Sequence, residues 1–145
     1  MKTLSIQASD NAIKNLIVEW AELLAKEKYT EAFNMFPHSA KENQWSPEEL
    51  KKCILNYGSP EQLEDSPPCK VTSLRSRNDF DKIFNGSIDV DRENMFDLDP
   101  ERYLGMVHFD DIPLDGDLSD LTARFHIMKI NNDKLTLEFL DIHVM

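Results

Sequence analysis

Residues 121–130 read LTARFHIMKI, residues 131–133 read NND, and residues 134–144 read KLTLEFLDIHV. The two apolar runs alternate in character and are rich in β-branched and aromatic side chains, which is typical of half-buried strands. The Asn-Asn-Asp segment between them has the composition of a turn. This stretch therefore predicts an antiparallel hairpin, and residues 102–112 predict a further strand of the same sheet.

The pairing that this turn sets decides which residues face the protein interior. If Ile130 pairs with Lys134, odd-numbered residues of both strands share one face and even-numbered residues share the other. The odd face collects the apolar side chains of the hairpin, namely Leu121, Ala123, Phe125, Ile127, Leu135, Leu137 and Phe139. The same rule places Asp141 and His143 on this inward face, and Arg124 on the outward one.

Helical patterns fill the part of the chain that precedes the strands. Residues 10–27 carry apolar side chains at intervals of three and four behind an N-cap at Asp10, which predicts a helix with one buried face. A shorter helix is predicted over residues 30–36 and ends where proline denies the helix an N–H donor. The segment Ser-Pro-Glu-Glu that starts at Ser46 is a capping box, and it predicts a third helix that buries Tyr57.

The middle of the chain has a different composition. Residues 59–70 contain three prolines and predict a loop, residues 71–75 predict the start of a strand, and residues 78–86 predict a short helix. Helices followed by strands in a chain of 145 residues predict a single α+β domain, residues 1–145. We expect its N-terminal helices to pack on one face of a curved antiparallel sheet.

Secretion and membrane insertion are not expected for this chain. Residues 1–12 lack the apolar run of a signal peptide, and no stretch reaches the roughly 18 apolar residues of a membrane span. Cys53 and Cys69 form no CxxC pair, and we expect them to be free thiols in a reducing compartment. The sequence therefore predicts a cytoplasmic protein.

Acidic side chains are concentrated in one segment. Residues 79–120 carry 13 acidic and 3 basic side chains, a net charge of −10, whereas the whole chain carries −11. Such a field repels DNA, RNA and anionic lipid, because proteins bind phosphate polymers through cationic side chains. It favours a basic protein partner, such as a nuclease-like toxin that the protein would neutralise. We expect that partner to contact five clustered acids: Asp110, Asp111, Asp115, Asp117 and Asp120.

The last third of the chain resembles known proteins. The segments SDLTARF at residues 119–125 and LDIHVM at residues 140–145 resemble the C-terminal signature of a small, uncharacterised family of bacterial proteins. That family is similar to the NTF2-like, or cystatin-like, superfamily of α+β cones. The resemblance implies helices packed on a cone-like sheet over most of the chain, and residues 59–101 match it least. Because the superfamily includes enzymes, adaptors and toxin-immunity proteins, the resemblance implies a fold more than a function.

A second hypothesis is a small ligand-binding protein or acid–base enzyme. The concave side of the sheet lines a pocket in an NTF2-like cone, so the resemblance implies that inward side chains of the sheet reach it. There Asp141 would orient His143 as a general acid or base. Arg124, near the start of its strand, would hold a ligand carboxylate. The structural alternative for Arg124 is an ion pair with Asp120 or Glu138.

Cofactor and metal signatures are missing from the sequence. The four histidines and two cysteines show no zinc spacing, the acidic pairs fail the pattern of an EF-hand, and no P-loop or dinucleotide-binding motif occurs. We expect no cofactor and no metal. A third hypothesis is a homodimeric scaffold, because the outer face of the sheet would carry five apolar side chains: Met128, Ile130, Leu140, Ile142 and Val144.

Overall fold

The structure is a computed structural model that describes residues 1–38, 45–57, 68–93 and 98–144. Its helices are α1 (Asp10–Ala25), α2 (Tyr29–Asn34), α3 (Pro47–Leu55) and α4 (Phe80–Gly86). Its strands are β1 (Leu4–Ser5), β2 (Ile88–Asp91), β3 (Tyr103–Phe109), β4 (Pro113–Leu114), β5 (Asp117–Leu118), β6 (Leu121–Lys129) and β7 (Lys134–Val144). None of the helices in these ranges has the length and apolar character needed to cross a membrane.

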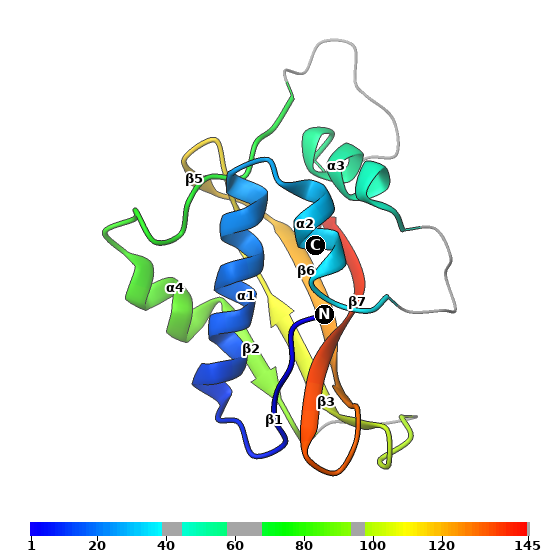
Figure 1. Ribbon diagram of the computed structural model, residues 1–145. Coiled ribbons are helices and arrows are strands. Elements are labelled where there is room, and N and C mark those ends of the chain that lie inside the picture. Colours follow the sequence, from blue (N-terminus) through cyan, green and yellow to red (C-terminus); the bar gives the residue numbers. More distant parts are fainter. Residues whose placement is uncertain (39–44, 58–67, 94–97, 145) are drawn as a thin grey trace.

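One antiparallel sheet carries α1 and α2 on a single face (Figure 1). Its strands lie in the order β1-β7-β6-β3-β2, and each neighbouring pair is antiparallel. The sheet is strongly curled, and a short hairpin of β4 and β5 stands apart from it. The predicted α+β class, with helices on one face of a curved antiparallel sheet, is confirmed.

Aromatic side chains join the helices to the sheet. Trp20 of α1 packs edge-on against Phe125 of β6, with ring centroids 5.2 Å apart, and also contacts Phe139 of β7. Phe36, just after α2, reaches the same Phe125 ring. All four side chains are buried, and each large ring removes about 150–250 Å² of surface from water. The predicted inward face of the sheet is thus confirmed as far as Phe139.

Serine side chains begin the first and third helices. Ser9 has an extended backbone, and its hydroxyl accepts the N–H of Ala12 at 3.2 Å, so Ser9 caps α1. The predicted cap, Asp10, is already the first helical residue. Ser46 accepts the N–H of Glu49 at 3.1 Å and Pro47 follows as the first helical residue, which confirms the predicted start of α3.

Tyr57 lies beyond the end of α3, contrary to the prediction of a buried helical position. The helix ends at Leu55, and the backbone of Tyr57 adopts a φ of 52°, in the left-handed region. This conformation ends the helical path and turns the ring away from the core. The residue is 39% exposed as a result.

The sequence analysis did not predict β2 or the β4–β5 hairpin. The hairpin turns at Asp115 and Gly116, whose φ values of 52° and 89° suit a two-residue type I′ turn. An Asp-Gly pair between apolar residues is a strong hairpin signal, but here it lies inside an acidic run. Conversely, the predicted strand over residues 71–75 is reduced to an isolated bridge at Val71.

Candidate functional site

The outer face of the sheet is the face turned away from α1, and it brings together Arg124, Asp141 and His143. Arg124 of β6 lies opposite Asp141 of β7, and its guanidinium donates two hydrogen bonds to the carboxylate, one of them 2.9 Å long. Nδ1 of His143 lies 3.2 Å from the same carboxylate. Asp141 thus connects a guanidinium to an imidazole.

A β-bulge places this cluster on the outer face. The register between β6 and β7 shifts between Arg124 and Phe125, so that Leu140 has no partner in β6. One extra residue reverses which side chains point inward, because strand side chains alternate with a period of two. The prediction that Asp141 and His143 face the interior is therefore wrong.

The same shift moves Ile142 into the core, where it is 3% exposed. Its predicted place in an outer apolar stripe is wrong for that reason. Of the other members of the stripe, Ile130 and Val144 are each 38% exposed, whereas Met128 and Leu140 are half-buried. The bulge therefore removes Ile142 from the predicted outer stripe, and the homodimer hypothesis stays a prediction.

Electrostatic interactions keep Asp141 ionised. Partial burial acts to raise its pKa, but the hydrogen bond and charge of Arg124, assisted by His143, outweigh burial and hold the pKa below its usual value. Arg124 thus forms an ion pair, and the partner that the structure shows is Asp141, whereas Asp120 and Glu138 were the predicted partners. An ionised Asp141 suits an imidazole that carries its proton on Nδ1, which is the arrangement of an oriented general acid or base.

A second polar cluster lies beside the first on the outer face. His126 of β6 lies opposite Glu138 of β7, with Nδ1 3.1 Å from the carboxylate. Tyr103 donates its hydroxyl to the same carboxylate at 3.3 Å, and burial together with the charge of Glu138 raises the pKa of Tyr103. Glu138 is only 4% exposed, so these hydrogen bonds compensate for removing its charge from water.

The surroundings of the outer face limit the chemistry that it supports. In the part of the chain that the structure describes, no group of three or more His, Cys, Asp and Glu side chains is placed to hold a metal ion. Hollows of about 610, 380 and 270 Å³ occur elsewhere on the surface, and neither Asp141 nor His143 lines any of the three.

The five acids predicted to meet a partner lie on the connection between β3 and β6, at one end of the sheet. Two of them are bound by hydroxyl groups of the chain. Asp110 accepts a hydrogen bond from Thr122 at 3.2 Å, and Asp111 accepts one from Ser87 at 3.0 Å. Both acids are half-buried, and these hydrogen bonds attach the connection to β6 and to the residue before β2.

The hairpin within this connection is fixed on both sides of its turn. Asp115 accepts the N–H of Lys70 through its carboxylate at 3.2 Å and donates its own N–H to the Lys70 carbonyl at 2.8 Å. The N–H of Gly116 binds the Thr72 hydroxyl at 3.1 Å, and Arg77 donates to the Gly116 carbonyl at 2.8 Å. The side chains that follow the turn are therefore presented from a fixed backbone.

Four exposed residues lie on the β4–β5 hairpin, on the segment that follows it and just beyond α3, and they are termed here the hairpin surface: Tyr57, Asp117, Leu118 and Asp120. Leu118 is 45% exposed and Tyr57 is 39% exposed. The hydroxyl oxygen of Tyr57 accepts the N–H of Asp120 at 3.1 Å, which joins the end of α3 to the hairpin. Figure 1 shows α3 and β5 at the same end of the fold.

Sequence analysis identified the acids of the hairpin surface but missed its apolar members. Helical periodicity assigns Tyr57 to the core, and only the left-handed turn after Leu55 reverses that assignment. Leu118 is a lone apolar residue in an acidic segment. A single apolar residue forms no periodic pattern, so its exposure cannot be predicted from the sequence. The Asp-Gly pair at residues 115–116 could have predicted the hairpin, because this pair is typical of a two-residue hairpin turn.

Cys53 and Cys69 are free thiols, as predicted. Burial, reinforced by the negative charges of Glu49 and Asp141, raises the pKa of Cys53 to about 11. Burial and the charge of Asp115 also raise the pKa of Cys69. Reactive cysteines need a lowered pKa, so neither thiol has the properties of a nucleophile.

Comparisons of this chain with protein-family models, with curated proteins and with solved structures find no match in any of the three. Kinship with the NTF2-like cones accordingly stays a prediction. The candidate sites are interpreted from their own geometry and charge.

Proposed function

We propose that this protein is a non-enzymatic binding protein that docks a basic protein partner through the hairpin surface. The observation that carries the proposal is that Tyr57 and Leu118 are both exposed, and that the Tyr57 hydroxyl accepts the N–H of Asp120 in the segment that also carries Asp117. Protein interfaces combine a small apolar or aromatic centre with a polar rim, and tyrosine is frequent among their energetically dominant residues. The hairpin surface has both parts on a fixed backbone.

Charge supports a basic partner over a neutral one. Residues 79–120 contribute −10 to a chain whose net charge is −11, and the hairpin surface lies within this segment apart from Tyr57. A field of this sign accelerates the approach of a cationic protein at a rate that falls as salt screens it. A basic nuclease-like toxin fits this description, because the carboxylates would occupy its phosphate-binding surface.

The proposed fold family is the NTF2-like cone. The support comes from helices that precede a curled antiparallel sheet and cover one of its faces. Adaptors and toxin-immunity proteins occur in that superfamily beside enzymes, so a binding role is compatible with it.

The experiment is a salt-graded capture from a lysate of the source organism at about 50 mM and about 300 mM salt, a range over which the Debye length shrinks. We expect one stoichiometric basic protein to bind the wild-type protein at low salt and more weakly at high salt. The double variant Asp117→Lys, Asp120→Lys should lose it. A matched control, Glu93→Lys with Glu101→Lys, makes the same change of charge at exposed positions at the other end of the sheet and should retain it.

Two outcomes contradict the proposal. Equal loss of binding in both double variants would mean that net charge, and not the hairpin surface, holds the partner. Retention by both variants would mean that the partner docks elsewhere. A folded state for each variant is verified by its thermal unfolding transition.

A second function is supported by the contacts of Asp141 with Arg124 and His143, 2.9 Å and 3.2 Å away. The alternative proposal is a small-ligand or acid–base site on the outer face. Saturation-transfer NMR with a panel of small carboxylic acids tests it. Transfer to a ligand that is lost in His143→Gln would support this function, and unchanged transfer would exclude it.

A further inference from the structure

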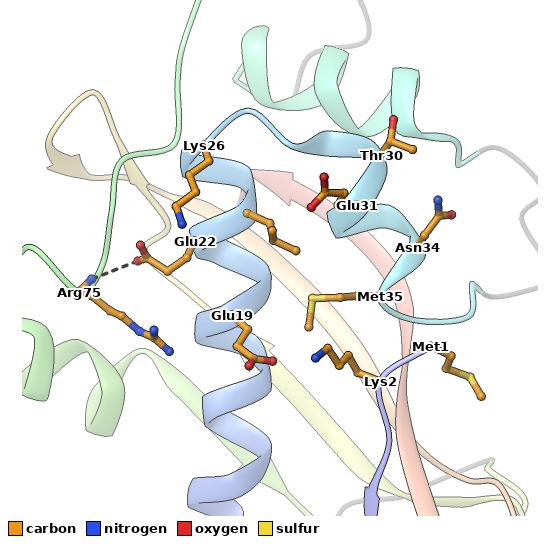
Figure 2. A pocket seen from close by; sticks show the side chains of 11 residues that line it. Met1, Lys2, Glu19, Glu22, Lys26, Thr30, Glu31, Asn34, Met35 and Arg75 are labelled. Carbon is orange, nitrogen blue, oxygen red and sulfur yellow. Dashed lines mark hydrogen bonds between the residues drawn. The ribbon is translucent and has the colours of Figure 1, made fainter.

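A groove on the helical side of the molecule lies away from both the outer face and the hairpin surface. It runs along the exposed side of α1 and has a volume of about 610 Å³ (Figure 2). One wall is formed by α2 and the first residues of the chain, and the other by the segment that carries Arg75. Its size falls within the roughly 300–1,000 Å³ of small-molecule sites. It is termed here the α1 groove.

Hydrogen bonds fix the wall that carries Arg75. The carboxylate of Glu22 in α1 accepts the Ser73 hydroxyl at 2.8 Å, the N–H of Leu74 at 2.8 Å and the N–H of Arg75 at 3.1 Å. Glu22 is therefore occupied by the wall itself. Because the backbone of Arg75 makes this contact, its side chain remains available to the groove.

The opposite wall is fixed as well. The N–H of Lys2 donates to the carbonyl of Met35 at 2.8 Å, and the carbonyl of Lys2 accepts the hydroxyl of Thr136 in β7. The first residues of the chain are thus bound to the end of α2 and to the sheet. A groove whose walls are bound to the fold needs little ordering when a ligand enters.

The chemistry of the groove is apolar at its floor and charged with both signs at its rim. Leu23 is half-buried and Met35 is buried, and the two side chains form the floor. The charged rim consists of exposed side chains: Lys2, Lys26 and Arg75 as cations, and Glu19 and Glu31 as carboxylates. Figure 2 shows Glu31 reaching toward α1 from one wall and Arg75 lying at the other.

The three cations are not neutralised by the fold. Within the described ranges, neither Lys2 nor Lys26 nor Arg75 makes an ion pair of 4.0 Å or less. Cations and carboxylates are nearly balanced around the groove, so a ligand with charge of only one sign would be repelled from part of the rim. A dipolar ligand meets an opposite charge at each of its ends.

We propose that the α1 groove binds a short peptide with free termini and apolar side chains. The peptide carboxylate lies at Arg75, which can hold it with two parallel hydrogen bonds. The peptide ammonium lies at Glu31 on the opposite wall, and the apolar side chains cover Leu23 and Met35 between them. This inference is independent of the proposed docking of a basic partner, because the two surfaces share no residue.

Titration calorimetry with four probes tests the inference: leucyl-leucine, its N-acetyl form, its C-terminal amide and glycyl-glycine. We expect saturable binding of leucyl-leucine and about tenfold weaker binding of each capped form, because each cap removes one charge-assisted contact. Glycyl-glycine should bind more weakly than leucyl-leucine, because it leaves the apolar floor uncovered.

Variants assign each end of the peptide to a residue. Arg75→Gln should weaken the binding of leucyl-leucine about tenfold and leave the binding of the C-terminal amide unchanged. Glu31→Gln should likewise weaken the binding of leucyl-leucine and leave the binding of the N-acetyl form unchanged. Lys52→Gln and Glu48→Gln on α3 are the matched controls and should change nothing. Absence of saturable heat at about 10 mM probe, an affinity too weak to be specific, would overturn the inference. Equal affinity for capped and uncapped probes, or equal losses in the control variants, would also overturn it.

Discussion

Arg124 and Asp141 face each other across β6 and β7 because Leu140 is left out of the ladder between them. Without this bulge, the alternation of the strand would carry Asp141 to the face that packs on α1. A carboxylate there would lie among the apolar side chains of the core. The bulge therefore keeps the charge of Asp141 on the outer face and gives it a cationic partner.

The first prediction concerns the stability that this pair supplies. Asp141→Asn should lower the free energy of unfolding by about 1–3 kcal/mol, the range for hydrogen bonds to charged groups. Urea unfolding at neutral pH measures the loss. Asp81→Asn, at an exposed acid whose side chain has no such partner among the described residues, is the control and should stay within about 0.5 kcal/mol of the wild type.

The second prediction concerns the pH dependence of the same pair. The folded-state pKa of Asp141 is lowered, so its ionised form stabilises the fold at pH values above the unfolded carboxyl pKa of about 4. This contribution is lost as the pH falls through the lowered folded pKa. The difference in stability between wild type and Asp141→Asn should therefore be complete at about pH 5 and shrink as the pH falls below the unfolded carboxyl pKa of about 4 and through the lowered folded pKa. A difference that stays constant over this range would contradict the account.

The third prediction concerns the close approach of β2 and β3 at Gly105. A Cβ at this position would lie 2.5 Å from the backbone oxygen of Asp91 and 3.1 Å from Cα of Arg92, so the two strands would have to separate. Gly105→Ala should cost more than about 2 kcal/mol of unfolding free energy. Gly86→Ala is the matched control, since its added Cβ meets no atom within 4 Å. Equal melting temperatures for the two variants would disprove the steric argument.

The fourth prediction concerns thiol reactivity. With a pKa of about 11, Cys53 is ionised to only about one part in a thousand at pH 8, so its reaction with an aromatic disulfide reagent should be slow. Cys53→Ser and Cys69→Ser separate the two rates. Fast modification of Cys53 in the folded protein would show that its surroundings open to solvent.

The fifth prediction separates binding from stability at the hairpin surface. Leu118→Ser should leave the unfolding free energy within about 0.5 kcal/mol of the wild type, because the side chain is already exposed. The same change should weaken binding of the captured partner about tenfold, because the partner would bury the Leu118 side chain. Ile130→Ser, an equally apolar residue 38% exposed at the turn between β6 and β7, should leave the affinity unchanged.

The sequence predicts much of the sheet, and its failure at one place has a physical cause. Within β7, apolar residues occupy odd positions from Leu135 to Phe139 and even positions from Leu140 onward. Such a change of phase is what a bulge produces, and Leu140 lies at the change. A register extended from the turn alone assigns every odd-numbered residue of β7 to the inward face, and so it places Asp141 on the wrong face.

The hairpin surface was beyond prediction for a different reason. Its acids are plain in the sequence, but their meeting with Tyr57 depends on the left-handed backbone after α3. Nothing in the helical pattern of residues 47–55 indicates that conformation. The α1 groove likewise assembles from segments that are distant along the chain, and no local motif marks it.

The most direct test of the proposed docking is a footprint of the captured partner on the backbone amides, recorded by heteronuclear NMR of the labelled protein. The account predicts that the resonances of Tyr57, Leu118 and Asp120 shift on binding, and that those of the outer face around Asp141 do not. Shifts centred on Asp141 and His143, with the hairpin surface unaffected, would contradict it.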